Sequence, residues 1–196
     1  MTAIGVVCDP QRALLWADTE IYRAGRAVGH MAKMASNLAA CIVGCGAGWA
    51  PLIRDANRAV AEAPDLHALV AEIPHLLRQR AAQVAEHHPD PSSFSGNCYV
   101  LAGWAPRYRR VAAYVFEAST FFTPEPAASF ASPFVADLAA MNAESFSDLD
   151  GVFIEQVAEI ERARGHPIGG KIVGALLVPH AITSFLCGRL DDEPHK

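Results

Sequence analysis

The first eighteen residues, MTAIGVVCDPQRALLWAD (1–18), decide how the rest of the chain is interpreted. Two apolar runs, at residues 3–8 and 13–17, flank the polar tetrapeptide DPQR at residues 9–12. Asp and Pro favour tight turns, and short apolar runs on either side of such a turn are typical of paired strands. The sequence therefore predicts that the chain opens with a β-hairpin.

More strands are predicted along the rest of the chain. A second strand pair is expected within residues 29–46, where the run AACIV (39–43) has the composition of a strand that is buried on both faces. Further strands are predicted at residues 98–104, 111–117, 171–178 and 182–190, and a Pro-rich connection is predicted at residues 124–132.

Helical spacing of apolar residues appears in two regions. It covers residues 52–60, and Asp65 is the predicted N-cap of a second helix that extends to Val84. Two more helices are predicted around residues 134–141 and 153–160. Two strand-rich regions and two helix pairs predict an α+β fold, a four-layer αββα sandwich in a single domain spanning residues 1–196.

Composition limits the classes of function. Apolar residues make up 52% of the 196 residues and charged residues 19%, which is typical of a packed globular domain. The net charge of −5 and the lack of a Lys/Arg run argue against a nucleic-acid partner. No apolar run reaches the roughly 18 residues that span a bilayer, and the N-terminus lacks the basic segment of a signal peptide. We therefore expect no membrane partner.

The cysteines and the missing motifs predict a cytoplasmic protein without a cofactor. The five cysteines are odd in number and show no paired spacing, which suits a reducing compartment. Cys41 and Cys45 lie close in sequence, but no second pair of Cys or His completes a zinc signature, so no metal site is expected. The sequence has neither a Gly-x-Ser-x-Gly elbow nor a Gly-x-Gly-x-x-Gly loop, which argues against a Ser hydrolase of that type and against a nucleotide cofactor.

Four short stretches resemble the proteasome β subunits of the N-terminal-nucleophile (Ntn) hydrolases. They are TAIGVV (2–7), AD (17–18), GHMAKM (29–34) and VGCGAG (43–48). The pattern is most similar to the bacterial heat-shock peptidase subunit that pairs with a ring unfoldase. Thr2, Asp18 and Lys33 keep that family's intervals of sixteen and fifteen residues between an N-terminal Thr, an Asp and a Lys.

The resemblance implies a threonine peptidase in which Thr2 is the nucleophile once Met1 has been removed. The free amine of Thr2 would be its base, because an unperturbed α-amino group has a pKa of about 8. Lys33 would favour the ionised hydroxyl by its positive charge, and Asp18 would orient Lys33. Ala47 lies in the Gly-rich turn, between Gly46 and Gly48, whose backbone N–H groups would stabilise the oxyanion.

The residues that would support the terminal amine depart from the family pattern. Proteasome subunits carry an Asp and a Ser at a helix–Gly-Gly–strand junction, and the matching positions here are Gly165 and Ile168. The other supporting Ser of the family has its candidates in Ser129 and Ser132. Cys8 is a further candidate nucleophile, but the cleavage that would expose it deletes the first strand.

Two functions follow from the resemblance. The first is a peptidase that cleaves polypeptides through an acyl-enzyme on Thr2, assembles as a homo-oligomeric ring and works with an ATP-dependent unfoldase. The second is a catalytically silent subunit of the same fold, such as an α-type ring subunit or a phage or particle assembly protein. The chain has no counterpart of the N-terminal helix of α-type subunits, which favours the first, whereas the loss of the Asp and Ser that support the terminal amine favours the second. A small-molecule amide hydrolase with the same N-terminal chemistry is a third alternative.

Overall fold

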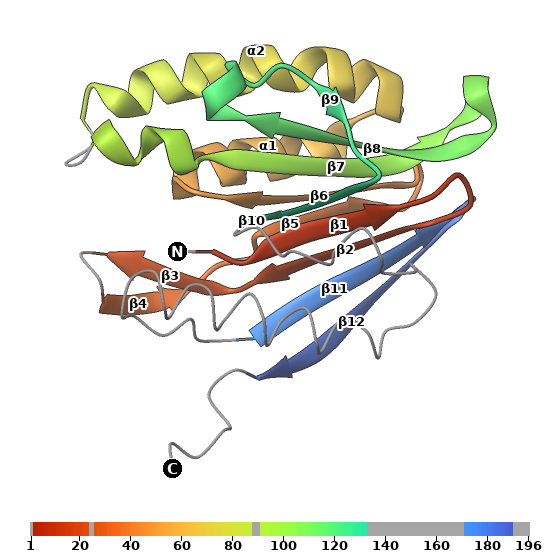
Figure 1. Cartoon of the computed structure of the whole chain (residues 1–196), viewed down its shortest axis with the longest axis horizontal. Helices are drawn as coiled ribbons and strands as arrows, with labels where there is room; N and C mark the ends of the chain where they lie inside the picture. The colour runs from red at the N-terminus through yellow and green to blue at the C-terminus, as the bar shows by residue number, and fades with distance from the viewer. Residues whose placement is uncertain (1, 24–25, 88–90, 133–170, 190–196) are drawn as a thin grey trace.

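The computed structural model describes residues 2–23, 26–87, 91–132 and 171–189. In these residues two five-stranded sheets stack face to face, and two α-helices cover the outer face of one of them (Figure 1). We call the sheet with strand order β10-β1-β2-β11-β12 the N-terminal sheet and the sheet with order β5-β6-β7-β8-β9 the helix-covered sheet. A two-stranded sheet, β3-β4, projects beside them. All strand pairs are antiparallel.

The bounds of the elements are as follows. The N-terminal sheet consists of β1 (Ile4–Cys8), β2 (Ala13–Asp18), β10 (Ser129–Ser132), β11 (Lys171–Val178) and β12 (Ala181–Arg189). The helix-covered sheet consists of β5 (Met34–Asn37), β6 (Ile42–Ala47), β7 (Cys98–Ala105), β8 (Arg110–Glu117) and β9 (Glu125–Pro126). The remaining elements are β3 (Glu20–Arg23), β4 (Arg26–His30), α1 (Ala50–Glu62), α2 (Leu66–Ala85) and the 3₁₀ turns Pro91–Gly96, Pro106–Tyr108 and Ala118–Thr120.

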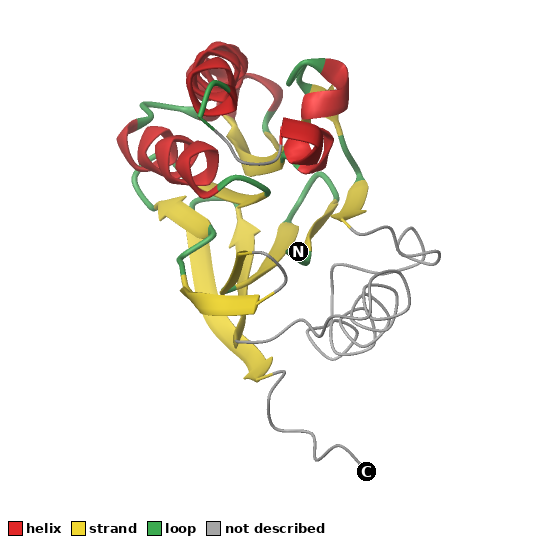
Figure 2. Cartoon of the chain, turned by 90° about the vertical axis from the view of Figure 1, so that its left-hand side faces the viewer, coloured by secondary structure: helices red, strands yellow, loops and turns green. Residues whose placement is uncertain are grey.

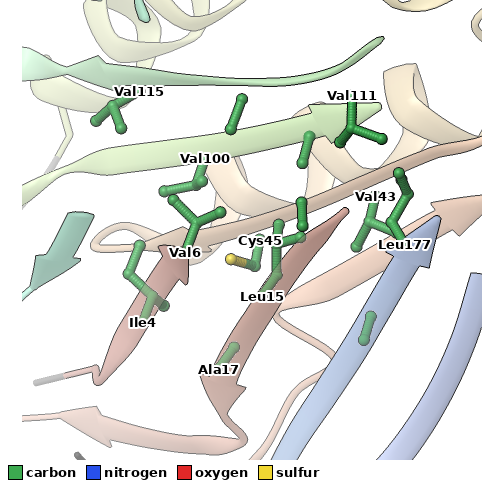
Figure 3. Close-up of a cluster of buried hydrophobic side chains, with 14 of the residues drawn as sticks. Ile4, Val6, Leu15, Ala17, Val43, Cys45, Val100, Val111, Val115 and Leu177 are labelled. Carbon is green, nitrogen blue, oxygen red and sulfur yellow. The ribbon is translucent and has the colours of Figure 1, made fainter. Parts of the chain in front are cut away.

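An apolar core fills the space between the two large sheets. Alternate residues of each strand point into it, as the period of two in a strand requires, so that Ile4 and Val6 of β1 face Val100 of β7 (Figure 3). The side chains of this core are small, and among the described residues no aromatic one belongs to its buried set. Aliphatic side chains of this size let the two sheets pack closely.

The helices lie over the outer face of the helix-covered sheet (Figure 2). They bury a second apolar core against it. Pro51 lies in the first turn of α1, where its missing N–H leaves no hydrogen bond unmade. The predicted N-cap of α2 is confirmed, because the Asp65 carboxylate accepts a 2.9 Å hydrogen bond from the Ala68 N–H. Among the described residues, neither helix combines the length and the apolar character needed to cross a membrane.

The predicted four-layer αββα sandwich is wrong. The described residues are mostly β, with two α-helices and three antiparallel sheets. The prediction needed a helix pair on each large sheet, whereas the apolar stripes of α1 and α2 both face the same sheet. The second helix pair, predicted around residues 134–141 and 153–160, lies outside the described residues. The described fold is therefore a helix layer on two stacked sheets.

The predicted strand at residues 39–43 is also displaced. The chain turns there, and β6 begins only at Ile42. The Asn37 side chain closes the turn, because its Oδ1 accepts a 3.0 Å hydrogen bond from the Ala40 N–H, and Cys41 adopts the left-handed conformation with φ of 53°. Turn chemistry at one residue thus outweighs the apolar composition that follows it.

Two strand regions were not predicted. The Pro-rich connection at residues 124–132 contains β9 and β10, and β10 pairs with β1, with Phe130 opposite Val6. The β3-β4 hairpin lies between the first hairpin and β5, where no strand before residue 29 was expected. The other predicted strands and both predicted helices of residues 50–85 are confirmed.

Candidate active site

Antiparallel pairing of β1 and β2 brings Thr2 and Asp18 to the same end of the N-terminal sheet. Thr2 comes just before β1, and Asp18 is the last residue of β2. Ile4 pairs with Ala17, and the Asp18 N–H donates a 3.0 Å hydrogen bond to the Ala3 carbonyl. The start of the chain is therefore fixed beside the end of β2 (the left side of Figure 1).

The β3-β4 hairpin returns the chain to the same place. It begins after Asp18, and its base is closed by a 2.8 Å hydrogen bond from the Met31 N–H to the Thr19 carbonyl. Lys33 follows two residues later, just before β5. A hairpin whose ends meet explains why residues fifteen apart in sequence become neighbours in space.

The ammonium of Lys33 joins the three predicted residues. Its Nζ donates one hydrogen bond to Thr2 Oγ1 and one to Asp18 Oδ2, each 2.8 Å long. The other oxygen of the carboxylate, Asp18 Oδ1, accepts a 2.8 Å hydrogen bond from the Ala3 N–H. Oδ2 also accepts a longer one, 3.2 Å, from the Glu20 N–H. The predicted contacts of Lys33 with Asp18 and with the hydroxyl of Thr2 are confirmed.

All three residues are buried. The exposed fractions are 8% for Thr2, 3% for Lys33 and 0% for Asp18. Charges removed from water in this way carry a large desolvation cost, which is offset only by close contact and by saturated hydrogen bonds. Such a pair is therefore an unusual feature to find at the edge of an apolar core.

The pKa values of the two charged groups shift in opposite directions. Burial raises the pKa of Asp18, although the Lys33 ammonium and the Ala3 N–H oppose this shift. Burial lowers the pKa of Lys33, with Asp18 and Glu20 acting against it. A lowered pKa makes the ammonium a stronger acid and hence a better hydrogen-bond donor to the hydroxyl of Thr2.

Of the predicted oxyanion donors, one is already engaged. Ala47 ends β6, two residues before the N-cap residue Trp49 of α1. The Gly46 N–H donates a 3.0 Å hydrogen bond to the Lys33 carbonyl, so it is not free to bind an oxyanion. Ala47 lies opposite Cys98 of β7 in the register of the sheet.

The predicted support from Ser129 does not lie beside Thr2. Ser129 is opposite Val7, five residues along β1 from Thr2, which corresponds to about 16 Å at the rise of an extended strand. Ser132 is opposite Ile4 and is the nearer of the two candidate serines. The remaining two positions, Gly165 and Ile168, lie outside the described residues.

Cys8 does not have the environment of a nucleophile. It ends β1, at the opposite end of that strand from Thr2. Burial raises the pKa of its thiol to about 11, so the thiolate is scarce at neutral pH. Cys41, Cys45 and Cys98 are also free thiols with raised pKa values, again because of burial.

Asn57 near the site was missed from the sequence. It lies on α1, and its Nδ2 donates a 3.0 Å hydrogen bond to the carbonyl of Ala32, the residue before Lys33. The feature of the sequence that could have indicated it is its position: Asn57 is a polar residue four positions after the buried Ile53, on the apolar stripe of the helix. A polar residue at such a position usually has a partner in the fold.

In the described ranges, no group of three or more His, Cys, Asp or Glu side chains is arranged to hold a metal ion. A scan against known protein-family models finds no match for this chain, and neither does a search of curated proteins.

Proposed function

We propose that the chain is an N-terminal-threonine peptidase that hydrolyses peptide bonds through an acyl-enzyme on Thr2. The observation that carries this proposal is the pair of 2.8 Å hydrogen bonds from Lys33 Nζ to Thr2 Oγ1 and to Asp18 Oδ2. A hydroxyl becomes a useful nucleophile only when a base takes its proton or a neighbouring charge favours its ionised form. Lys33 supplies that charge at the atom that would react.

The base in this proposal is the α-amine of Thr2, which becomes free when Met1 is removed. As Oγ1 attacks the carbonyl carbon of the peptide bond, its proton passes to the amine and then to the leaving nitrogen. An ester on Oγ1 remains, and water hydrolyses it with the same amine as base. The Lys33 ammonium stays protonated throughout, and Asp18 balances its charge.

Asp18 has a second task in this mechanism. Its Oδ1 holds the Ala3 N–H at 2.8 Å, which fixes the peptide that follows Thr2. The nucleophile and the ammonium are thus anchored to the same carboxylate. A 1 Å displacement of a reacting group can cost about 100-fold in rate, so this shared anchor is the geometric core of the proposal.

Mass and reactivity test the proposal together. Intact mass from the native host should show loss of Met1. A peptide β-lactone should then acylate wild-type protein once per chain, and Thr2→Ala should abolish both acylation and peptide cleavage. Lys33→Ala should lower the cleavage rate by about 100-fold or more, on the scale of one positioned catalytic group. Lys171→Ala is the matched control, because this exposed lysine should leave the rate unchanged.

Retention of Met1 in the native host would contradict the proposal, because the proposed base would be acylated. Full activity of Thr2→Ala would contradict it as well. A folded Lys33→Ala protein with the wild-type rate would show that the contact between Lys33 and Thr2 is not needed for the reaction, which would also contradict the proposal.

The substrate in this proposal is a polypeptide, and the enzyme is a closed homo-oligomeric ring in the cytoplasm. A ring would keep the reactive threonines away from folded neighbours, and cyclic symmetry is common among homo-oligomers. An ATP-dependent unfoldase would then supply extended substrate. The free thiols of Cys8, Cys41, Cys45 and Cys98 fit a reducing compartment. Light scattering tests assembly: a monomer alone at micromolar concentration would overturn this part.

The burial of Thr2 favours a second candidate function, a catalytically silent subunit of an assembly. Only 8% of the residue is exposed, which leaves its hydroxyl little open surface for a substrate. The same contacts would then serve to anchor the start of β1. A wild-type protein that has lost Met1, assembles, and yet reacts with no β-lactone or epoxyketone probe would support this candidate.

A further inference from the structure

We infer that Asn57 and Tyr99 are positioning residues that hold the Lys33 segment in place from the helix layer. Tyr99 lies on β7, Asn57 on α1, and the two are linked to Ala32 by consecutive hydrogen bonds. The role in reactivity rests on the proposed function, whereas the role in placing Lys33 does not.

The direction of these hydrogen bonds is fixed by their partners. The carbonyl of Ala32 can only accept, so the Nδ2 of Asn57 must face it, at 3.0 Å. The Oδ1 of Asn57 then faces the hydroxyl of Tyr99, which donates at 2.7 Å. Burial raises the pKa of Tyr99 well above its usual value, which keeps that hydroxyl protonated and able to donate.

Two glycines of β6 make room for the tyrosine. Tyr99 is 1% exposed and lies across the face of β6. A Cβ atom at Gly44 would come within 2.6 Å of the Tyr99 hydroxyl, and one at Gly46 within 2.7 Å of its ring. A real Cβ atom essentially never comes this close to another heavy atom, so the absence of both Cβ atoms is what lets the hydroxyl reach α1.

The consequence for Lys33 comes from its backbone. The Ala32 carbonyl is held by α1 through Asn57, and the next carbonyl, that of Lys33, accepts the 3.0 Å hydrogen bond from the Gly46 N–H of β6. Two successive carbonyls are therefore fixed to two different elements. This restricts the position from which the lysine side chain reaches Thr2, because the backbone sets where its stem begins.

Three variants separate the parts of this support. Asn57→Ala removes both hydrogen bonds, and Tyr99→Phe removes only the hydroxyl. Asn57→Asp keeps the shape and the acceptor for Tyr99 but places a carboxylate oxygen against the Ala32 carbonyl. Arg54→Ala, an exposed position on the same helix, is the matched control.

We expect the acylation of Thr2 by a peptide β-lactone to slow by about 10-fold in Asn57→Ala and in Asn57→Asp, and by less in Tyr99→Phe. Cleavage of a peptide substrate should slow through kcat, with KM unchanged, because the support acts on Lys33 and not on bound peptide. Arg54→Ala should react at the wild-type rate. Wild-type kcat in both Asn57 variants, with folding confirmed by circular dichroism, would overturn the inference.

A second measurement does not depend on catalysis. In protein labelled with ¹⁵N-lysine, the Nζ signal of Lys33, assigned by its loss in Lys33→Ala, should titrate at higher pH in Asn57→Ala, the Asn57 variant that adds no charge near the lysine. A loosened lysine is better hydrated, while Asp18 and Glu20, the acidic groups that act on it, stay in place. If the wild type never reacts, the proposed function fails, and this titration alone decides the inference. An unchanged Lys33 titration would overturn it.

Discussion

The buried pair of Asp18 and Lys33 should behave differently when one member is removed and when both are. Lys33→Met keeps the length of the side chain but leaves the carboxylate of Asp18 without its counter-charge, at 0% exposure. Asp18→Asn leaves the ammonium of Lys33 unbalanced at 3% exposure. Each single change should lower the free energy of unfolding by about 3–5 kcal/mol, the scale for an orphaned buried charge.

The double variant should be more stable than either single one. Without either charge the desolvation cost disappears, and the amide oxygen introduced by Asp18→Asn can still accept the hydrogen bond from the Ala3 N–H. A double variant that is more stable than either single one must recover more than the larger single loss, so we expect a coupling free energy above about 3 kcal/mol between the two substitutions, beyond the upper end for most residues in direct contact.

Urea unfolding followed by circular dichroism measures all four proteins, at one protein concentration because an oligomer makes stability depend on concentration. The reasoning would be refuted if each single variant lost no more than about 1 kcal/mol, the value typical of exposed pairs, and the two effects simply added. The site would then be wetter than its burial indicates.

Three further predictions use other parts of the site and fold. The rate of the β-lactone reaction should have a bell-shaped pH profile, which rises as the terminal amine loses its proton near pH 8 and falls as the Lys33 ammonium loses its own. The falling limb should lie below the ordinary lysine pKa of 10.5, because burial lowers the pKa of Lys33. A falling limb at or above that value would contradict the pKa direction. Iodoacetamide at pH 8 should leave Cys45 and Cys98 unmodified in native protein, since burial raises the pKa of both thiols, to about 12 for Cys98; peptide mapping that finds them alkylated as fast as in urea would count against this. Asp65→Ala should lower the free energy of unfolding by about 1 kcal/mol through loss of the hydrogen bond from the Ala68 N–H, whereas Asp65→Asn should lose much less.

The three site residues could be found from the sequence because their spacing reflects local chain geometry. A hairpin returns Asp18 to the start of β1, and a second hairpin returns Lys33 to Asp18. The intervals between these residues are the lengths of those hairpins. The resemblance supplied the intervals, and the strand register supplies the physical reason for them.

The layers of the fold could not be predicted in the same way. A helical stripe shows that a helix covers an apolar surface, but it does not say which sheet provides that surface. Both α1 and α2 face the helix-covered sheet, and a count of helices assigned one pair to each sheet. The turn closed by Asn37 could not be predicted either, because the residues that follow it are apolar and have the composition of a strand.

The supporting residues depend on contacts that are distant in sequence. The resemblance offers Ser129 and Ser132 as candidates for the supporting serine, and only the register of β10 on β1 shows that Ser129 lies opposite Val7 and away from Thr2. Asn57 holds the carbonyl of Ala32 from 25 residues away, and no spacing rule connects a helix to the turn before β5. Its only mark in the sequence is a polar residue on an apolar stripe.

The buried charges of Asp18 and Lys33 bear on whether the site only anchors the start of β1 or also reacts. To fix the start of β1, a neutral Asn at position 18 would suffice, because the Ala3 N–H needs only an acceptor. The ammonium of Lys33 adds a hydrogen bond to Thr2 Oγ1, but this arrangement buries two charges. A cost of that kind is easier to explain if the hydroxyl of Thr2 has to ionise than if it only anchors the chain. The variant carrying both Asp18→Asn and Lys33→Met therefore separates the two roles. For a reactive centre it should be folded, free of Met1 and unable to react with a β-lactone, whereas a wild-type rate of acylation in that variant would show that the charges serve only the fold.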